Sequence, residues 1–180
     1  GDPITPVLTG ADQRATDQAR RLRAGPRGLA LHHRTGTPIH PMAPVVKLRW
    51  FVEEQPDLAR RVAHWVGIKD HLLSRLTGEL VVDHGIASAM GMFNLQDGAW
   101  DAEALAYVGI DEGALPALVP TTSVLKLSAD DLGVPVGTAL VVGGADGPLA
   151  NLGLGATRPG AVACSIGTSG ALRVATDRVR

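Results

Sequence analysis

The sequence predicts a mixed α/β fold in which helices outnumber strands. Segments rich in helix-forming residues fill the N-terminal half, whereas short apolar runs bounded by glycine lie toward the C-terminus. The chain has 180 residues, of which 45% are hydrophobic, so it can bury a sizeable core in one large domain or slightly more.

Helix-forming residues and stop signals place the expected helices. The first candidate is rich in helix formers and runs up to Gly25 and Pro26, which predicts that it stops there. Residues 28–42 contain turn chemistry around Gly36 and Pro38 and are predicted to form a loop. Pro44 suits the first turn of the helix that follows. The expected helices cover residues 12–23, 45–54, 57–66, 68–76, 100–108 and 148–154.

The expected strands are short. Residues 138–142 are apolar and bounded by glycines, which favours a buried parallel strand. Residues 161–166 and 171–175 predict a hairpin closed by residues 167–170. A further strand is expected over residues 79–83.

Charge and aromatic content argue against a nucleic-acid partner. Seventeen Lys and Arg stand against eighteen Asp and Glu, for a net charge of −1, which leaves no basic footprint for a polyanion. Aromatic residues make up 3% of the chain and are scattered, so no base-stacking surface is expected.

The remaining composition indicates where the protein works. No run of 18 or more apolar residues occurs, and the N-terminus lacks the basic and apolar regions of a signal peptide, so no membrane association is expected. Cys164 is the single cysteine, which excludes an internal disulfide and suits a reducing, cytoplasmic location. The chain begins without Met, in what reads as the middle of a protein, so a fragment is expected.

A carboxylate follows the expected strand over residues 138–142. Asp146 lies in the segment Gly-Gly-Ala-Asp-Gly-Pro, residues 143–148, at the strand end where ligands of α/β folds collect. A carboxylate there can accept the proton of a substrate hydroxyl. The alternative is that Asp146 only caps the next helix, and the two roles are compatible.

A second glycine-rich segment, Ile-Gly-Thr-Ser-Gly at residues 166–170, lies between the last two strands. Backbone N–H groups and hydroxyls in such a turn can hold phosphate, although ordinary hairpins have the same composition. The six histidines show no repeated metal-ligand spacing, so no metal site is assigned to them.

Ten motifs follow one another in order along the chain: Asp12-x-Arg14, residues 34–44, Lys47, Trp50, residues 67–70, 81–83, 87–92, 118–122, 143–148 and 166–171. This ordered set resembles the FGGY carbohydrate kinases, and within them the gluconate kinases, over essentially the whole chain. Residues 34–44 and 87–92 are the segments typical of gluconate kinases.

The resemblance implies a kinase of the ribonuclease-H-like actin/hexokinase superfamily, with sugar and MgATP meeting in a cleft between two domains. Residues 1–155 would be the latter part of the N-terminal, sugar-binding domain, and residues 156–180 the first hairpin of the C-terminal, nucleotide-binding domain. The implied reaction is ATP-dependent phosphorylation of a sugar acid, most naturally D-gluconate to 6-phosphogluconate. The alternatives are a xylulose-type pentulose kinase and a non-catalytic sugar-binding or structural remnant. The protein could also form a homodimer.

The resemblance also assigns residues. It maps the catalytic base onto Asp146 and the turn that contacts the ATP phosphates onto Gly167, Thr168 and Ser169. It also places Asp12, His40 and Met42 against the sugar. Lys47 is expected to be a structural partner. The family's usual Trp is replaced by Gly10, which removes one wall of the expected pocket.

Overall fold

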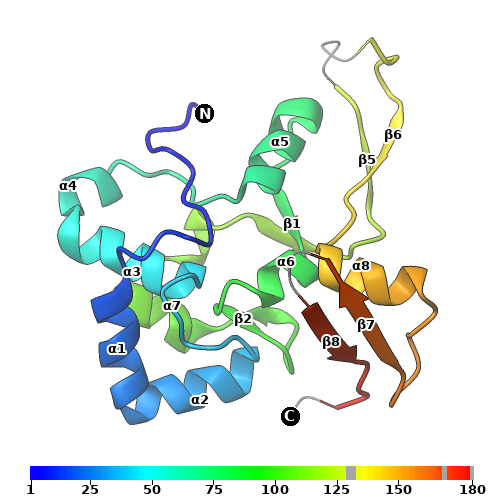
Figure 1. The fold of residues 1–180 in the computed structure, drawn as a ribbon. Coiled ribbons are helices and arrows are strands. Elements are labelled where there is room, and N and C mark those ends of the chain that lie inside the picture. The colour runs from blue at the N-terminus through cyan, green and yellow to red at the C-terminus, as the bar shows by residue number, and fades with distance from the viewer. Residues whose placement is uncertain (129–132, 168–169, 179–180) are drawn as a thin grey trace.

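The computed structural model describes residues 1–128, 133–167 and 170–178, and its mixed helix and strand content confirms the expected fold class (Figure 1). The helices are α1 (Thr16–Ala24), α2 (Pro26–Thr35), α3 (Pro44–Glu54), α4 (Pro56–Ala59), α5 (Ile68–Thr77), α6 (His84–Ser88), α7 (Ala102–Val108), the 3₁₀ turn η1 (Glu112–Ala114) and α8 (Asp146–Gly153). The strands are β1 (Val81–Asp83), β2 (Phe93–Asn94), β3 (Ala99–Trp100), β4 (Ala117–Val119), β5 (Val124–Lys126), β6 (Ala139–Val141), β7 (Val162–Ile166) and β8 (Gly170–Val174).

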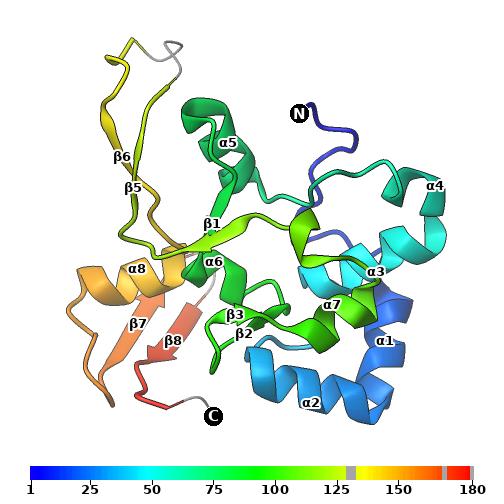
Figure 2. The same cartoon turned by 180° about the vertical axis from the view of Figure 1, so that it is seen from behind.

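Helices α1, α2, α3 and α7 gather at one side of the molecule, and the small β2–β3 hairpin lies beside them (Figures 1 and 2). Their apolar faces form the main core, which includes Leu31, Val45, Val46, Met92 and Val108. These side chains are almost completely removed from water, so the core fixes the mutual placement of the helices.

The predicted loop over residues 28–42 is wrong in its first part, because α2 occupies Pro26–Thr35. Pro26 stands in the first turn, and the helix ends at Gly36, whose φ of +68° is the left-handed conformation typical of a helix C-terminus. Gly28 does not break the helix. A Cβ there would lie 2.2 Å from the carbonyl oxygen of Leu22, so glycine allows α1 and α2 to approach each other closely.

Two other helix predictions in the first half of the chain had wrong bounds. The helix expected over residues 57–66 is only α4, Pro56–Ala59, which buries none of its residues. Further on, the amide of Trp65 donates to the carbonyl of Ala114, and this bond draws the chain out of the helical path. The first helix begins at Thr16 rather than at residue 12, after a turn in which Asp12 binds Arg14.

The centre of the molecule is the parallel pair β1 and β4, with Val81 opposite Ala117 and Asp83 opposite Val119. Leu73 of α5 packs with Val81 of β1, Leu125 of β5 and Val142 in a second, smaller core. This arrangement places the carboxyl end of β1 at α6, beside the start of α8 (Figure 1).

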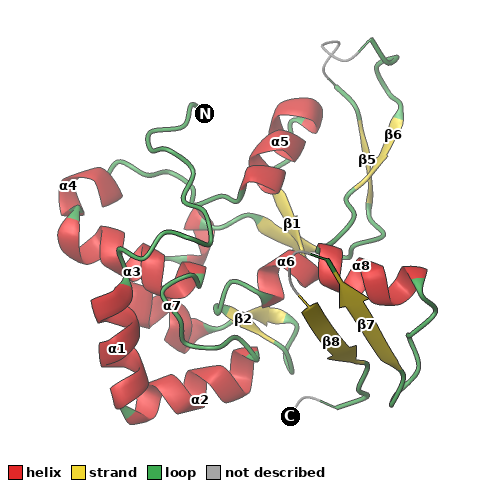
Figure 3. Cartoon of the chain, viewed as in Figure 1, coloured by secondary structure: helices red, strands yellow, loops and turns green. Residues whose placement is uncertain are grey.

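The expectation of a buried parallel strand over residues 138–142 is wrong in its pairing. β6 pairs antiparallel with β5, and the two strands form an arm that projects from the body (Figure 3). Only one face of this ribbon can reach the second core, so Val142 just beyond it is buried while Val141 is exposed. A glycine-bounded apolar run does not distinguish these two environments.

The C-terminal segment is the antiparallel hairpin β7–β8, as predicted, and it packs beside α8 (Figure 1). Its register places Ala163 opposite Arg173 and Ile166 opposite Gly170. Thr168 and Ser169, which belong to the expected phosphate turn, lie outside the described residues. In the part of the chain that the structure describes, no helix has both the length and the apolar character needed to cross a membrane.

Candidate active site

Asp146 is the first residue of α8, and its side chain is exposed. The helix therefore begins two residues earlier than predicted. The N-cap position belongs to Ala145, whose side chain cannot accept a hydrogen bond, and Asp146 Oδ1 accepts from the amide of Gly147 at 2.7 Å. A carboxylate at this exposed position can accept the proton of a hydroxyl group that binds beside it. Asp146 can thus serve both the helix terminus and a bound hydroxyl.

The backbone before Asp146 is fixed by hydrogen bonds to the segment that follows β4. The amide of Val142 donates to the carbonyl of Ser123 at 2.9 Å, and that of Gly143 donates to the carbonyl of Thr121 at 3.0 Å. Gly143 has a φ of +71°, which residues with a Cβ rarely adopt. Residues 142–145 therefore make a sharp and defined turn into α8.

Two charged residues that the sequence analysis did not nominate lie beside this turn. Asp83, at the end of β1, is fully buried and forms an ion pair with Lys69 of α5. Lys69 Nζ also donates to the carbonyls of Val142, at 3.1 Å, and Gly143, at 3.3 Å. Both residues belong to segments that carry the family resemblance, residues 67–70 and 81–83, but neither had been assigned a role in the site.

The predicted sugar-contacting residue Asp12 is held by Arg14. Asp12 Oδ1 accepts from the backbone amide of Arg14 at 3.1 Å and from its Nε at 2.9 Å, and these bonds hold the pKa of Asp12 below its ordinary value. The guanidinium of Arg14 in turn lies 4.8 Å from the centroid of the Trp50 indole, within range of a cation–π interaction. Asp12 and Trp50, which both belong to the motifs of the family resemblance, are thereby joined through Arg14.

Met42 and His40, the other predicted sugar-contacting residues, are exposed, and Met42 lies next to Gly10. A Cβ on Gly10 would lie 3.6 Å from Met42 Cε and would meet no other heavy atom within 4 Å, so the space at Gly10 is otherwise open. The amide of Met42 donates to His40 Nδ1 at 3.2 Å. Lys47 is buried, and its Nζ donates to the carbonyl of Thr9, which fits the expected structural role.

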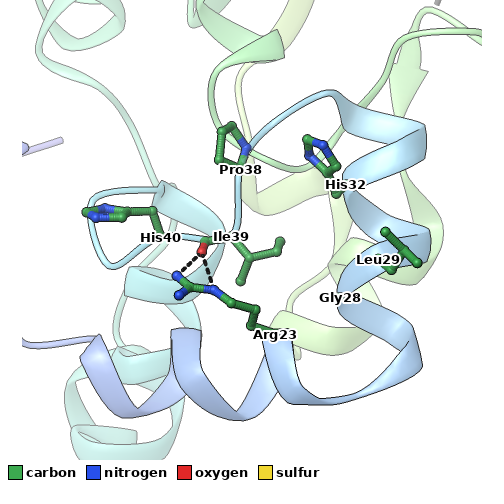
Figure 4. A pocket seen from close by; sticks show the side chains of 7 residues that line it. All are labelled: Arg23, Gly28, Leu29, His32, Pro38, Ile39 and His40. Carbon is green, nitrogen blue, oxygen red and sulfur yellow. Dashed lines mark hydrogen bonds between the residues drawn. The ribbon is translucent and has the colours of Figure 1, made fainter. Parts of the chain in front are cut away.

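A pocket of about 410 Å³ lies between α1, α2 and the chain at residues 38–40 (Figure 4). Arg23 is bonded to the carbonyl of Ile39, and His32 Nδ1 lies 3.0 Å from the carbonyl oxygen of Thr37. Of the predicted site residues, only His40 lines the pocket, with its ring turned away from His32 (Figure 4). Because its polar side chains are bound to the protein's own backbone, we do not place the chemistry there.

The predicted site residues fall into separate groups. Within residues 1–128, 133–167 and 170–178, no hydrogen bond or ion pair joins Asp146 to Asp12, His40 or Met42. Gly167 follows β7 and leaves its surroundings open, since a Cβ there would meet no heavy atom within 4 Å. The hairpin nevertheless approaches Asp146, because a Cβ on the neighbouring Gly147 would lie 2.9 Å from Arg173 Nε.

The residues that the structure describes include no cluster of three or more His, Cys, Asp or Glu side chains able to hold a metal ion. Asp146 is the one carboxylate at the start of α8, and Asp83 behind it is already paired with Lys69. Because Mg²⁺ is usually held by one or two carboxylates together with nucleotide phosphates, this finding does not identify a magnesium site, and we assign these residues no metal-dependent step.

Comparison with known proteins identifies the family. Residues 1–153 match the FGGY family of carbohydrate kinases, N-terminal domain. The chain belongs to this family. A gluconokinase of Bacillus licheniformis is 43% identical over 98% of the chain, and one of Bacillus subtilis is 40% identical. A xylulose kinase of Streptomyces coelicolor is 37% identical over 99% of the chain.

Solved structures agree with this assignment. A gluconate kinase and a ligand-bound xylulose kinase, both from Lactobacillus acidophilus, each superpose with a TM-score of 0.92 at 32% identity and cover 96% of the chain. The FGGY kinase fold is thereby confirmed. The chain spans 35% of the two gluconokinases and 36% of these two structures.

Proposed function

We propose that the full-length protein containing this chain is an ATP-dependent sugar kinase that converts D-gluconate to 6-phosphogluconate. The choice of gluconate as substrate rests on sequence identity. The chain is 43% and 40% identical to two gluconokinases, but 37% and 34% identical to two xylulose kinases over nearly the same residues. The motifs at residues 34–44 and 87–92 point in the same direction.

In the proposed reaction Asp146 is the general base. Its carboxylate accepts the proton of the substrate's terminal hydroxyl while the hydroxyl oxygen attacks the γ-phosphorus of ATP, and ADP leaves with the electron pair of the broken P–O bond. The exposed position of Asp146 at the start of α8, directly after the turn at residues 142–145, supports this role. Asp12, His40 and Met42 are proposed to contact the sugar acid.

The proposed phosphate donor is ATP, with its phosphates held at Gly167, Thr168 and Ser169. A magnesium ion bound with the nucleotide would neutralise phosphate charge. Because the described residues offer no acidic cluster, this part of the proposal rests on the family alone. We also propose a domain boundary at residue 155, with the β7–β8 hairpin belonging to the nucleotide-binding domain.

A xylulose-type pentulose kinase is the second candidate function. The gluconate kinase and xylulose kinase structures have equal TM-scores to this chain, so the fold does not distinguish the two substrates. A panel of gluconate, xylulose, ribulose and glycerol, measured as kcat/KM on the full-length protein, separates the two. We expect gluconate to give the highest value. A pentulose in first place would replace the proposed substrate, and no turnover at all would support a non-catalytic remnant.

The role of Asp146 is tested by Asp146→Asn in the full-length protein. The amide keeps the size and the hydrogen-bond acceptor but cannot take up the proton, so kcat should fall by about 10²- to 10⁴-fold with little change in Tm. The matched control is Asp17→Asn, another exposed carboxylate in a first helical turn, which should leave kcat unchanged. If Asp146→Asn keeps a near-normal kcat and melts lower, Asp146 is only a helix residue.

A further inference from the structure

We infer that Lys69 and Asp83 are positioning residues that hold the turn carrying Asp146 and thereby set kcat. This inference rests on the proposed role of Asp146 as the base. Asp83 lies at the end of β1, Lys69 lies in the first turn of α5, and the turn at residues 142–145 leads into α8, so three separate parts of the chain meet here.

The ammonium group of Lys69 has three N–H donors, and three acceptors surround it. They are Asp83 Oδ1, the Val142 carbonyl oxygen at 3.1 Å and the Gly143 carbonyl oxygen at 3.3 Å. Two of the acceptors therefore belong to the backbone of the turn itself. The remaining acceptor is the buried carboxylate of Asp83. If the turn moved away from β1, the Lys69 ammonium could move with it only by breaking the ion pair with Asp83.

Asp83 is fixed independently of Lys69. Its side chain is 0% exposed, and Oδ2 accepts from the amide of Ile86 at 3.0 Å, which caps α6. The carboxylate thus ties β1 to α6 with one oxygen and to Lys69 with the other. The anchor for the turn belongs to the central, buried part of the fold.

The turn also packs directly against this anchor. A Cβ on Gly144 would lie 3.5 Å from Asp83 Oδ2 and 3.1 Å from Thr121 Cγ2. A Cβ on Gly85 would lie 2.8 Å from Asp83 Oδ2 and 3.6 Å from the amide nitrogen of Ala145. The backbone before Asp146 is therefore held on one face by Lys69 and on another by Asp83 and the start of α6.

This arrangement has a consequence for catalysis. A base must stay within hydrogen-bond reach of the hydroxyl, and a displacement of about 1 Å can cost about 100-fold in rate. Ala145 has no side chain with which to cap α8, so the turn supplies the constraint on the first residue of that helix. The pair does not touch the predicted sugar-contacting residues, so it should act on kcat and leave the KM for the sugar unchanged.

The test uses the double variant Lys69→Met/Asp83→Asn in the full-length protein, with the best sugar of the substrate panel. Methionine keeps an unbranched stem, and asparagine keeps an acceptor for the amide of Ile86, so no buried charge is left without a partner. We expect kcat to fall by about 10- to 100-fold while the KM for the sugar stays within about twofold. In the Asp146→Asn background the same pair of changes should cost less than about threefold, because the residues act through one group.

The matched control is Arg34→Met/Asp101→Asn. Asp101 is likewise buried, caps a helix and pairs with a cation, but this pair contacts α7 rather than the turn. The control should lower Tm and leave kcat per folded molecule unchanged. If Lys69→Met/Asp83→Asn fails to fold, Gly85→Ala replaces it, since the added methyl crowds Asp83 and the turn while keeping both charges; the same kcat loss is expected.

The inference is overturned if the folded variant keeps kcat within about twofold of the control, or if its loss is undiminished in the Asp146→Asn background. If either result is found and Asp146→Asn is inactive, only the positioning role of Lys69 and Asp83 is refuted. An active Asp146→Asn protein instead refutes the proposed base, and the positioning role with it.

Discussion

The junction between α2 and α7 depends on one buried carboxylate, Asp101, and we expect its removal to be costly. The side chain is 4% exposed; Oδ2 accepts from Arg34 Nε at 2.6 Å, and Oδ1 accepts from Arg34 Nη2 at 3.2 Å. Oδ1 also accepts from the amide of Ala104 at 2.8 Å, which caps α7. The variant Asp101→Ala removes the cap and the ion pair together.

The magnitude follows from these contacts. Loss of an N-cap costs about 0.5–2 kcal/mol, and loss of one partner of a buried ion pair costs about 3–5 kcal/mol. The second figure is reduced here, because the Arg34 side chain is partly exposed and keeps its ion pair with Glu103. We expect Asp101→Ala to lower the free energy of unfolding by about 3 kcal/mol, and Asp101→Asn, which retains an acceptor for the cap, by about half as much.

The assay is urea unfolding at pH 7 and across the acid range. Burial raises the pKa of Asp101, but the hydrogen bonds from Arg34 and Ala104 outweigh it and hold the pKa below its ordinary value of about 3.8. The stabilisation is therefore fully present above about pH 5 and is lost as the pH falls through the lowered, folded-state pKa. Asp101→Ala should have a shallower acid decline than the wild type.

The matched control is Asp17→Ala, which removes an exposed ion pair with Arg20 and should change stability by no more than about 0.5 kcal/mol. A loss below about 1 kcal/mol for Asp101→Ala, or the same acid decline in variant and wild type, would show that the junction does not depend on this carboxylate.

Further predictions concern burial, packing and completeness. Burial raises the pKa of Asp70, so the wild-type protein should lose stability as the pH rises from about 4 through that raised pKa. Asp70→Asn should reduce this pH dependence when Tm is measured across the pH range. An unchanged dependence of Tm on pH would contradict the prediction. Gly28→Ala should lower the free energy of unfolding by more than about 2 kcal/mol, because the added Cβ would overlap the Leu22 carbonyl. Gly153→Ala, where a Cβ meets no heavy atom within 4 Å, should be neutral or stabilising. Equal effects of the two variants in urea titrations would refute the close packing of α1 against α2. The 180 residues alone should show no gluconate phosphorylation in a coupled ADP assay, because they span 35% of the gluconokinases; measurable turnover would contradict this.

Local signals in the sequence were sufficient for several elements. Pro44 marks the start of α3, Gly78 marks the end of α5, and the two apolar runs around residues 167–170 form the predicted hairpin. These features depend on backbone preferences over a few residues, so they can be recognised without knowing the fold. The ordered motifs likewise sufficed for the family, which the comparisons confirm.

Tertiary contacts decided what local signals could not. Gly28 resembles a helix breaker in sequence, yet it lies inside α2 because the neighbouring helix leaves no room for a Cβ. The run at residues 138–142 has the composition of a buried strand, yet β6 pairs antiparallel in a projecting arm, because its environment is set by which strand it meets.

The candidate site divides in the same way. Asp146 could be named from the sequence, because a carboxylate among glycines after an apolar run is a local pattern. Lys69 and Asp83 lie in two of the family motifs, but the sequence does not show that Lys69 contacts the carbonyls of Val142 and Gly143, which are more than seventy residues away along the chain. Hydrogen bonds over such separations exist only once β1, α5 and the turn have been packed together, because the sequence specifies the groups and the folded backbone brings them within 3.5 Å.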